Sequence, residues 1–596
     1  MKRDEYKKLI RDISAPYSVW IRDKEIKREE RELKIPSDYT LYLDGDGDID
    51  PGLSDALNEY GAFENGFDFI YTDEDETDKK GRRHDPFFKP DHSPDTLECF
   101  YYPGGLTIVK NSLVSRISPA SSQREGSLEF LRECGKAAEK PLHIPEVLYH
   151  AGSRHGYGYK GESEKTDSTV LPESVAVVIL SKDHPELLKT CVTGLFRAGR
   201  EEKVGIECVV LDNGSSEENT LRYEALSKEF GFAYVREERA FVFSALCNKG
   251  AGLTGSPLLL FLNDDIEVPE HTAFLKEMMA EALKKSTGAV GCKLLYPDGR
   301  IQHIGISLLK SGGSHCFSGY RDDVSYQRGV NRIKRNVFGV TGACLMVERK
   351  KFEEVGGFDE ALAVAYTDTD LCAALLCKGY YNVCLNGIFL IHHESFSRKA
   401  DGAEKEKFKR LKEERSFFYK KYSDILINGD PWYNKNLTGT GLDMGVDVPG
   451  TEERIPFYDL NSLRGTEESV KGAKKAEEGQ ILYNIEGIEI LNNDAAGHED
   501  FLDIRGWGFL HGKGGYEYDI LVVVRGADRN YVLETGRIFR EDLPAVFPKE
   551  KDILLSGFEV KAAAEAFGDI EGIKVSLVFK GKDIFGRDRS YIINES

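Results

Sequence analysis

Two adjacent carboxylates at the end of an apolar run carry the first chemical signal in this chain. Residues 258–262 (LLLFL) have the character of a buried strand, and Asn263, Asp264 and Asp265 follow directly. Hard divalent cations such as Mg²⁺ take oxygen ligands and are commonly held by one or two carboxylates together with substrate phosphates. Acidic residues after strands are most often solvated turn residues, but this pair predicts a site for a metal-bound diphosphate.

A second acid ends another predicted strand. Residues 208–211 (CVVL) lead into Asp212, and the turn-forming sequence Asn-Gly-Ser-Ser follows. In open α/β sheets the carboxyl ends of parallel strands border one crevice, and ligands bind there. We therefore expect Asp212, Asp264 and Asp265 to lie along the same edge of a sheet.

The segments around these acids alternate between strands and helices. Residues 175–180 form a β-branched run that ends at Ser181, and residues 185–196 have apolar positions at helical spacing. A second helix is predicted over residues 217–230, before residues 243–250 and the strand that begins at 258. The order strand, helix, strand, helix, strand predicts a nucleotide-binding half sheet of the α/β class.

Over residues 173–400 these motifs closely resemble the family 2 glycosyltransferases of the GT-A fold. Residues 290–305, 340–346 and 356–372 are similar to segments of bacterial members that build surface polysaccharides, including rhamnosyltransferase-like ones. The resemblance implies a Rossmann-like mixed sheet and a bound Mg²⁺ or Mn²⁺. Asn263 occupies the first position of the family's DxD-type motif, so Asp265 is the expected main metal ligand. The residues expected to bind the nucleotide sugar are Ser181, Asp183, Asp212, Asn248 and Asp264.

The same resemblance places the catalytic base at Asp368. Thr367 stands where the family more often has Glu or Asn. A positioned carboxylate can take the proton of an attacking hydroxyl and contributes a factor of roughly 10²–10⁴ to the rate. Asp370 is more often a capping residue than a reactive one, and we expect it to cap a helix that begins near Leu371.

Residues 391–398 (IHHESFSR) are similar to a terminal motif of the family whose histidine can be a third metal ligand. We predict that His392 or His393 binds the metal, although a neutral imidazole is also an ordinary buried side chain. Arg398 would add positive charge near a departing diphosphate. His303 and His315 are expected to be hydrogen-bonded structural residues.

The N-terminal part repeats the acid-rich strand end. Residues 40–43 run into Asp44, Asp46 and Asp48, parallel to the later residues 260–268. The likeness begins at this strand, so the strands that would bind a nucleotide base are missing. We predict that residues 36–155 are a degenerate glycosyltransferase half-domain without transferase activity, and that residues 1–35 form a helical segment before it.

The remaining segments are predicted to be joints and a separate C-terminal domain. Residues 156–172 and 426–480 have the composition of linkers, whereas a helix over 404–422 would close a catalytic domain spanning 173–425. Short apolar runs separated by turns predict a β-sandwich accessory domain over 481–596. Trp507 in that domain could stack on a sugar, but a single tryptophan in a strand is more often part of the core.

Composition limits the kinds of partner. The chain has 596 residues and a formal net charge of −21, which argues against nucleic-acid binding. Its eleven cysteines lack metal-binding or redox spacing, the first residues are charged, and no apolar run approaches the ~20 residues of a membrane span. We expect a cytoplasmic protein of three or four domains. The basic cluster at residues 405–412 leaves open a peripheral contact with the inner face of the membrane.

Together these features predict an inverting, metal-dependent transferase. It would move a sugar from a UDP- or dTDP-sugar to a growing cell-surface glycan or a lipid-linked acceptor. A catalytically silent scaffold in a glycan-assembly complex is the alternative from another class. A nucleotidyltransferase would need a Gly-rich basic loop after the first strand, and residues 181–185 (SKDHP) do not form one.

Overall fold

The computed structural model describes two compact units. It covers residues 25–152 except 79 and 119–124, residues 170–393 except 239 and 310–311, 429–438, 442–447, most of 474–594, and some positions in 17–21 and 410–422. One unit comprises Ile26–Leu437 with Gly441–Met444, and the other comprises Gly445–Ser596 with Met1–Glu25 and Thr438–Thr440. The predicted half-domain and the predicted catalytic domain thus belong to the same unit.

The largest sheet has the strand order β11-β18-β12-β17-β10-β7-β8-β9. Its parallel part consists of β7 (Ser174–Ser181), β8 (Gly205–Asp212), β9 (Ala233–Arg236) and β10 (Leu258–Asn263). These strands are almost uninterrupted apolar runs because both faces of the sheet are covered. Val177 and Ile179 pack into a core on one face, and Ala176 and Val178 pack into a core on the other. The predicted α/β half sheet is confirmed.

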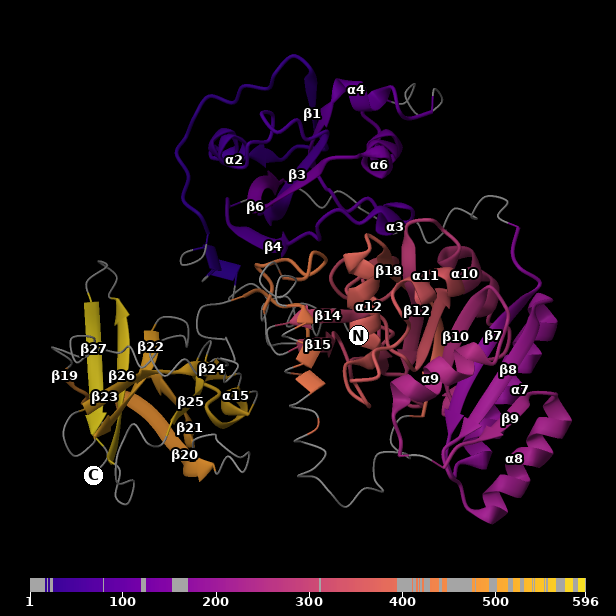
Figure 1. The fold of residues 1–596 in the computed structure, drawn as a ribbon. Coiled ribbons are helices and arrows are strands. Elements are labelled where there is room, and N and C mark those ends of the chain that lie inside the picture. The colour runs from indigo at the N-terminus through magenta and orange to yellow at the C-terminus, as the bar shows by residue number, and fades with distance from the viewer. Residues whose placement is uncertain are drawn as a thin grey trace. The chain divides into compact units, whose positions relative to one another are not determined.

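Helices cover the two faces of this sheet (Figure 1). The first core includes residues of α7 (Pro185–Glu202), α8 (Glu217–Phe230) and α10 (Phe274–Ala282). The second includes residues of α9 (Phe243–Gly252), α11 (Arg349–Glu354) and α12 (Thr367–Cys377). Local signals fix the bounds of α8, because the Ser216 side chain accepts from the backbone N–H of Asn219 and Gly231 ends the helix with φ 80°.

The other half of the sheet is mixed. It contains β11 (Ile266–Glu267), β12 (Thr287–Leu295), β17 (Cys344–Glu348) and β18 (Tyr381–His392), with β13 (Ile301–His303) and β16 (Lys334–Val337) at its margins. β17 runs antiparallel to both β10 and β12, whereas β12 and β18 are parallel. A separate hairpin joins β14 (Ile306–Leu309) to β15 (Gly312–His315). This mixed α/β sheet agrees with the predicted GT-A architecture.

A smaller sheet lies in the N-terminal part of the same unit. Its path is β1-β5-β3-β6-β2, and β4 pairs with β3. The strands are β1 (Tyr39–Leu43), β2 (Asp48–Ile49), β3 (Phe69–Thr77), β4 (Arg83–Phe87), β5 (Leu106–Lys110) and β6 (Pro141–Ala151). The helices around it are α2 (Leu53–Glu59), α3 (Pro94–Leu97), α4 (Asn111–Val114) and α6 (Leu128–Ala137).

Buried polar contacts join the N-terminal part to the larger sheet. The Asn336 side chain on β16 donates to Asp95 Oδ2 at 2.7 Å and accepts from the backbone N–H of Asp95 at 3.0 Å. Lys334 on the same strand forms ion pairs with Glu98 and with Glu281. Since these groups are largely buried, the two parts pack as one body.

Residues 430–437 also pack within this unit, although they were predicted to belong to a linker. The backbone N–H of Asp91 donates to the Pro431 carbonyl at 2.8 Å, and Asn434 donates to Asp73 Oδ2 at 2.9 Å. Trp432 is only 5% exposed, which gives this polar stretch an apolar anchor that its overall composition hides. Most of the other predicted linker residues, and most of the predicted helix at 404–422, lie outside the described residues.

The C-terminal unit contains two sheets. One has the order β19-β27-β26-β22-β23 and the other β20-β21-β25-β24, and a single hydrophobic core takes residues from both. Trp507 is half-buried against that core, with its ring centroid 5.4 Å from that of Phe547. We keep the β-sandwich as a prediction for this unit. The bounds are β19 (Lys474–Lys475), β20 (Ile481–Leu491), β21 (Phe501–Leu510), β22 (Tyr518–Arg525), β23 (Asn530–Glu534), β24 (Gly536–Ile538), α15 (Leu543–Val546), β25 (Gly557–Ala563), β26 (Lys574–Lys582) and β27 (Asp588–Asn594).

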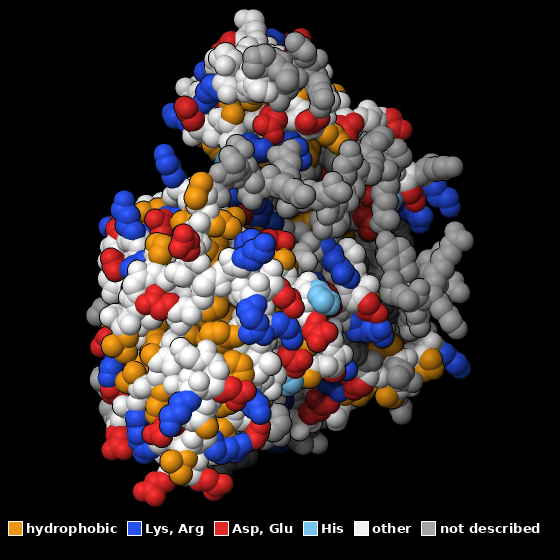
Figure 2. Space-filling view, turned by 90° about the vertical axis from the view of Figure 1, so that its right-hand side faces the viewer, with side chains coloured by type: hydrophobic (Ala, Val, Ile, Leu, Met, Phe, Trp, Pro, Cys, Tyr) orange, Lys and Arg blue, Asp and Glu red, His pale blue; other side chains and the backbone are white. Residues whose placement is uncertain are grey.

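Several general expectations can be compared with the structure. All eleven cysteines are free thiols. Among the described residues no helix combines the length and the apolar character that a membrane span requires. On the face shown in Figure 2, lysine and arginine side chains are interspersed with aspartate and glutamate, so this face presents mixed charge.

Candidate active site

Asp264 and Ser181 meet at the carboxyl edge of the parallel strands. Ser181 ends β7, and its hydroxyl donates to Asp264 Oδ2 at 2.5 Å. The Tyr223 hydroxyl lies 2.8 Å from Ser181 Oγ and also accepts from the backbone N–H of His184. Burial is the main cause that raises the pKa of Asp264 to about 7; the Ser181 hydrogen bond opposes it, and the charge of Asp265 adds to it. Two predicted donor-binding residues therefore touch each other.

Asp265 faces His392 from the neighbouring strand. Ile266 of β11 pairs with His392 of β18, and this register brings His392 Nε2 to 3.1 Å from Asp265 Oδ1. Burial raises the pKa of Asp265, but the contact with His392 outweighs it, so the pKa lies below its usual value. The contact does not have hydrogen-bond geometry. Asp265 Oδ1 and His392 Nδ1 are thus buried polar atoms without a hydrogen-bond partner among the described residues.

His393 has different neighbours. Its backbone N–H donates to the Asp265 carbonyl at 2.9 Å, while its side-chain Nε2 lies 2.7 Å from Glu267 Oε2. The sequence did not distinguish the two histidines. The structure places the His392 ring against the carboxylate of Asp265 and the His393 ring against Glu267.

Asp368 is held in the first turn of α12 and is only partly buried. Its Oδ2 accepts from the backbone N–H of Gly342 at 2.9 Å, and its Oδ1 accepts from that of Thr369 at 2.7 Å. The next carbonyl along the turn, that of Ala343, accepts from the backbone N–H of Asn263 at 3.0 Å. Through this short turn, Asp368 is tied to the end of β10, where Asp264 and Asp265 begin.

The predicted start of the following helix was wrong. α12 begins at Thr367, because Tyr366 adopts a left-handed conformation with φ 60° and turns the chain into the helix four residues early. Asp370 lies inside the first turn and does not cap it. Its carboxylate accepts from Lys421 Nζ at 2.8 Å.

The sequence of this region matches a known family. Residues 174–356 match the family model described as Glycosyl transferase family 2. They form a family 2 glycosyltransferase domain. The matched segment contains β7 to β17, and therefore Asp264, Asp265 and the Gly342 turn that holds Asp368.

Three known proteins are similar to parts of this chain. The O-antigen biosynthesis protein RfbC of Myxococcus xanthus is 30% identical over 486 residues, which cover 74% of this chain and 37% of that protein. The N-acetylglucosaminyl-diphospho-decaprenol L-rhamnosyltransferase of Mycobacterium tuberculosis is 30% identical over 129 residues, or 20% of this chain and 40% of that protein. The chain thus spans well under half the length of these two relatives. A mannosyltransferase of Pyrobaculum calidifontis, solved with GDP-Man and Mn²⁺, is 14% identical with a TM-score of 0.29, covering 39% of this chain and 60% of the other.

Asp212 of the glycosyltransferase domain is fully buried, and protein donors occupy both of its oxygens. Oδ1 accepts from the backbone N–H and the hydroxyl of Ser215 at 2.9 and 2.6 Å, and Oδ2 accepts from the Tyr234 hydroxyl at 2.6 Å. In this structure Asp212 fixes the turn that follows β8. Its role in binding the nucleotide sugar stays a prediction.

Asp183 and Asn248 are also engaged with the protein. Asp183 Oδ1 accepts from the backbone N–H of Ser216 and from Asn219 Nδ2, both at 2.9 Å, and these bonds lower its pKa. Asn248 bonds to the backbone of Phe358 in both directions, at 2.9 Å each, and donates to Glu360 at 3.0 Å. Asp183 is a partly exposed residue beside the start of α8, whereas Asn248 links α9 to the 357–360 turn.

The groups that hold these side chains were not predicted. Tyr223, Tyr234 and the backbone of Gly342 position Ser181, Asp212 and Asp368. Neither tyrosine belongs to a motif, whereas Gly342 lies in the family-like segment 340–346. His303 and His315 contact each other through their rings, and their structural role stays a prediction. Their Nδ1 atoms lie 3.0 Å apart, and burial lowers the pKa of His303 well below its usual value.

The donor set at the carboxyl edge fits a divalent cation. Asp265 offers a buried oxygen and His392 a buried nitrogen, neither in a hydrogen bond among the described residues. Another group of ligand-type atoms, from Glu76, His84 and Asp85, lies in the N-terminal part, with all atoms within 4.8 Å. Glu76 is paired there with Arg328, and His84 Nδ1 lies 3.1 Å from Asp85 Oδ2, so these groups already have partners within the protein. Arg398 and the rest of residues 394–398 lie outside the described residues.

Proposed function

We propose that this chain is an inverting glycosyltransferase that uses a divalent cation and a pyrimidine nucleoside diphosphate sugar. The observation that carries the proposal is the meeting of Asp264, Asp265 and His392 at one sheet edge, next to the turn that holds Asp368. A silent scaffold would not need a buried carboxylate oxygen and a buried imidazole nitrogen that lack hydrogen-bond partners among the described residues, because such atoms cost stability.

Asp265 and His392 would hold the cation, either Mg²⁺ or Mn²⁺. When bound, it supplies Lewis-acid stabilisation of the charge that develops on the departing diphosphate. His393 is the weaker metal candidate because its ring is paired with Glu267. Asp264, which Ser181 holds beside Asp265, would orient the donor. Asp183 is the most accessible of the residues predicted to bind the nucleotide sugar.

Asp368 is the proposed catalytic base. The acceptor hydroxyl oxygen bonds to the anomeric carbon, the bond from that carbon to the phosphate oxygen breaks, and its electron pair leaves with the nucleoside diphosphate. The hydroxyl proton moves to a carboxylate oxygen of Asp368. Hydrogen bonds from Gly342 and Thr369 hold this carboxylate in place, so it needs no reorganisation before it accepts the proton.

The names of two relatives indicate the class of acceptor. One relative is named for O-antigen biosynthesis and another for rhamnosyl transfer to a lipid-linked sugar. We therefore propose a cell-surface glycan or its lipid-linked precursor as acceptor.

Isothermal titration calorimetry of the full chain with UDP and dTDP tests the core of this proposal. Each nucleotide is titrated with Mn²⁺, with Mg²⁺ and with EDTA. We expect binding that requires the metal. A chain that binds neither nucleotide under any of these conditions would instead support the scaffold function.

We also infer that residues 36–155 are a degenerate half-domain with an architectural role. The support is topological, because the N-terminal sheet repeats the pairing of β10, β17, β12, β18 and β11 but has no counterpart of β7, β8 or β9 among the described residues.

A further inference from the structure

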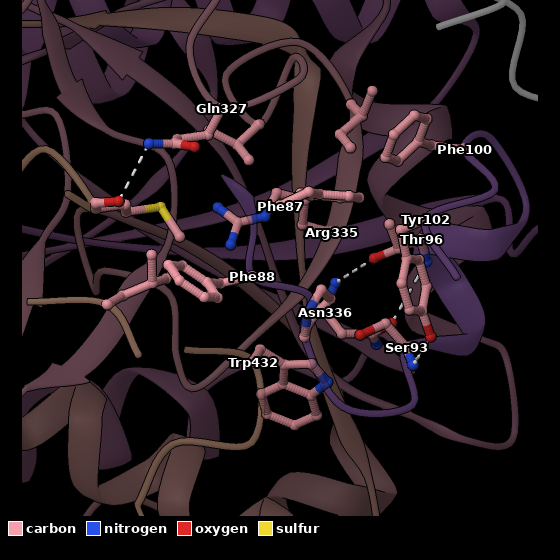
Figure 3. Close-up of a pocket in the computed structure, with 15 residues that line it drawn as sticks. Phe87, Phe88, Ser93, Thr96, Phe100, Tyr102, Gln327, Arg335, Asn336 and Trp432 are labelled. Atoms are coloured by element: carbon pink, nitrogen blue, oxygen red, sulfur yellow. Dashed lines mark hydrogen bonds between the residues drawn. The ribbon is translucent and has the colours of Figure 1, made fainter. Parts of the chain in front are cut away.

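An apolar cavity lies where three segments of the larger unit meet. Its volume is about 50 Å³, which is room for more than one water-sized group. Phe87, Phe88 and Phe100 line it from the N-terminal part, Arg335 from β16, and Trp432 from the 429–437 segment (Figure 3). The cavity is separate from the carboxyl edge described above, since none of the candidate site residues lines it.

Arg335 is the charged residue in this wall, and it has no partner in the part of the chain that the structure describes. It is 8% exposed, and it makes no side-chain hydrogen bond, ion pair or aromatic contact with any residue of the described structure. The Asp430 charge reaches it only beyond ion-pair distance, and the oxygens of Asp430 already accept from the backbone N–H groups of Leu308 and Trp432. Burial without a partner lowers the pKa of Arg335.

A buried charge without a partner needs an explanation. Buried guanidinium groups are normally paired, because removing their charge from water destabilises the folded protein unless an opposing charge or good hydrogen bonds offset the loss of hydration. Neighbouring cations show the usual solution. Lys334 pairs with Glu98 and Glu281, and Arg328 pairs with Glu76 while lying over the Phe87 ring at 4.8 Å. Arg335 alone among these is left with its charge directed to a cavity.

We propose that this cavity is a binding site for a small oxyanion, a phosphoryl or carboxylate group, with Arg335 as its counter-charge. The planar guanidinium presents a fork of N–H donors that matches the two oxygens of such a group. The rings of Phe88 and Trp432 provide an apolar wall for the part of the ligand that carries the anion. Because the wall comes from both α/β parts, a bound anion would also strengthen their packing.

The ligand is tested with three defined probes on the full chain: inorganic phosphate, glucose 1-phosphate and glucuronate, each compared with chloride at equal ionic strength. The chain has three tryptophans, and replacing Trp20 and Trp507 by Phe leaves Trp432 as the only indole reporter. We expect at least one probe to change Trp432 fluorescence saturably and to raise the melting temperature. A response to both phosphates assigns the phosphoryl group, and a response to glucuronate alone assigns the carboxylate.

Variants locate the response. Arg335→Gln should weaken the binding of the active probe at least ~10-fold, the loss expected for a charge-assisted hydrogen bond, and Arg335→Lys should weaken it less. The matched control is Arg328→Gln, which removes a nearby arginine that is already paired and should leave binding within about twofold. Arg335→Met, which keeps the apolar stem, should melt in chloride at or above the wild-type temperature, because it removes an uncompensated charge.

Three results would overturn the proposal. They are the absence of a saturable response to every probe, unchanged binding by Arg335→Gln, and a clear loss of stability of Arg335→Met in chloride. The Asp265→Ala variant separates this site from the donor site and should keep the Trp432 response. If Asp265→Ala abolishes that response while Arg335→Gln retains it, the anion binds at the donor site.

Discussion

The two α/β sheets of the larger unit share one plan but differ in extent. The order β1-β5-β3-β6-β2 corresponds strand by strand to β10-β17-β12-β18-β11, and each pairing has the same sense in both sheets. Only the second sheet continues into β7, β8 and β9. The N-terminal sheet thus forms without counterparts of β7, β8 and β9 while it packs on the larger sheet. The crevice that would receive a nucleotide needs those additional parallel strands.

The comparison also holds at the corner that would bind a metal. Ile49 pairs with Tyr149 in the first sheet, and Ile266 pairs with His392 in the second. The Tyr149 hydroxyl donates to the Asp44 carbonyl at 2.7 Å and accepts from the backbone N–H of Gly47 at 3.2 Å. Tyr149, whose hydroxyl already makes two hydrogen bonds, therefore occupies the position that His392 has in the second sheet. His392 has a ring nitrogen without a hydrogen-bond partner among the described residues. The backbone geometry is kept, and the ligand chemistry is not.

The largest expected difference between the two sheets concerns donor binding. Asp265→Ala should abolish metal-dependent binding of UDP or dTDP, because the diphosphate loses the cation that neutralises it. Asp48→Ala, at the corresponding corner of the first sheet, should bind as the wild type does. Calorimetry with Mn²⁺ measures both. Equal affinity and equal Mn²⁺ dependence in Asp265→Ala would move the metal site elsewhere.

A second difference concerns turnover. Asp368→Asn should keep donor affinity but lower the transfer rate at least ~10²-fold, since the amide preserves shape and removes only the proton acceptor. Asp370→Asn is the matched control two residues away. Because Asp370 is paired with Lys421, this substitution should leave turnover within several-fold of wild type. Transfer assays under saturating donor report both rates. A near-normal rate for Asp368→Asn would reassign the base.

The third prediction concerns the packing of one sheet on the other. Removing residues 1–155 should lower the solubility and melting temperature of the remaining chain, because it uncovers β16, leaves the Asn336 side chain without Asp95 and leaves Lys334 with Glu281 alone. Asn336→Ala should cost ~1–3 kcal/mol of stability, since the buried Asp95 loses its amide partner. Asp44→Ala and Asp46→Ala should leave transfer intact. Loss of an activity in these two variants that Asp265→Ala spares would make the first sheet a working transferase.

The last expected difference is a pH dependence confined to the first sheet. His150 lies between Asp75 and Asp50, at 2.6 and 3.2 Å, and Asp75 also pairs with Arg83. Burial lowers the pKa of His150, but the two carboxylates outweigh it and raise the pKa to about 9.

The raised pKa of His150 means that its proton stabilises the folded protein by up to ~3 kcal/mol. This stabilisation is complete below pH ~6.5, the pKa of histidine in the unfolded chain, and is lost as the pH rises through about 9. Melting temperatures between pH 6.5 and 9.5 should fall more steeply for the wild type than for His150→Gln. Parallel curves would show that the His150 proton adds no stability.

Sequence alone determined the parts of this protein whose signals are local. Apolar runs predicted β7, β8 and β10, and the predicted helix at about residues 217–230 agrees with α8, which Ser216 and Gly231 cap in the structure. The repeated acid-rich strand end also pointed to a second, incomplete sheet, whose topology the structure supplies. These features depend on residues that are neighbours in the sequence, so they can be predicted without the tertiary structure.

Tertiary structure decided how each polar side chain is used. Asp212 and Asn248 are saturated by Tyr234 and Phe358, which are 22 and 110 residues away along the chain. Strand register, not composition, set His392 against Asp265 and His393 against Glu267. No sequence motif marks Arg335, and only the packing of three distant segments buries it without a partner among the described residues. Whether a polar group is satisfied depends on what surrounds it in space, and for these residues the surroundings come from distant parts of the chain.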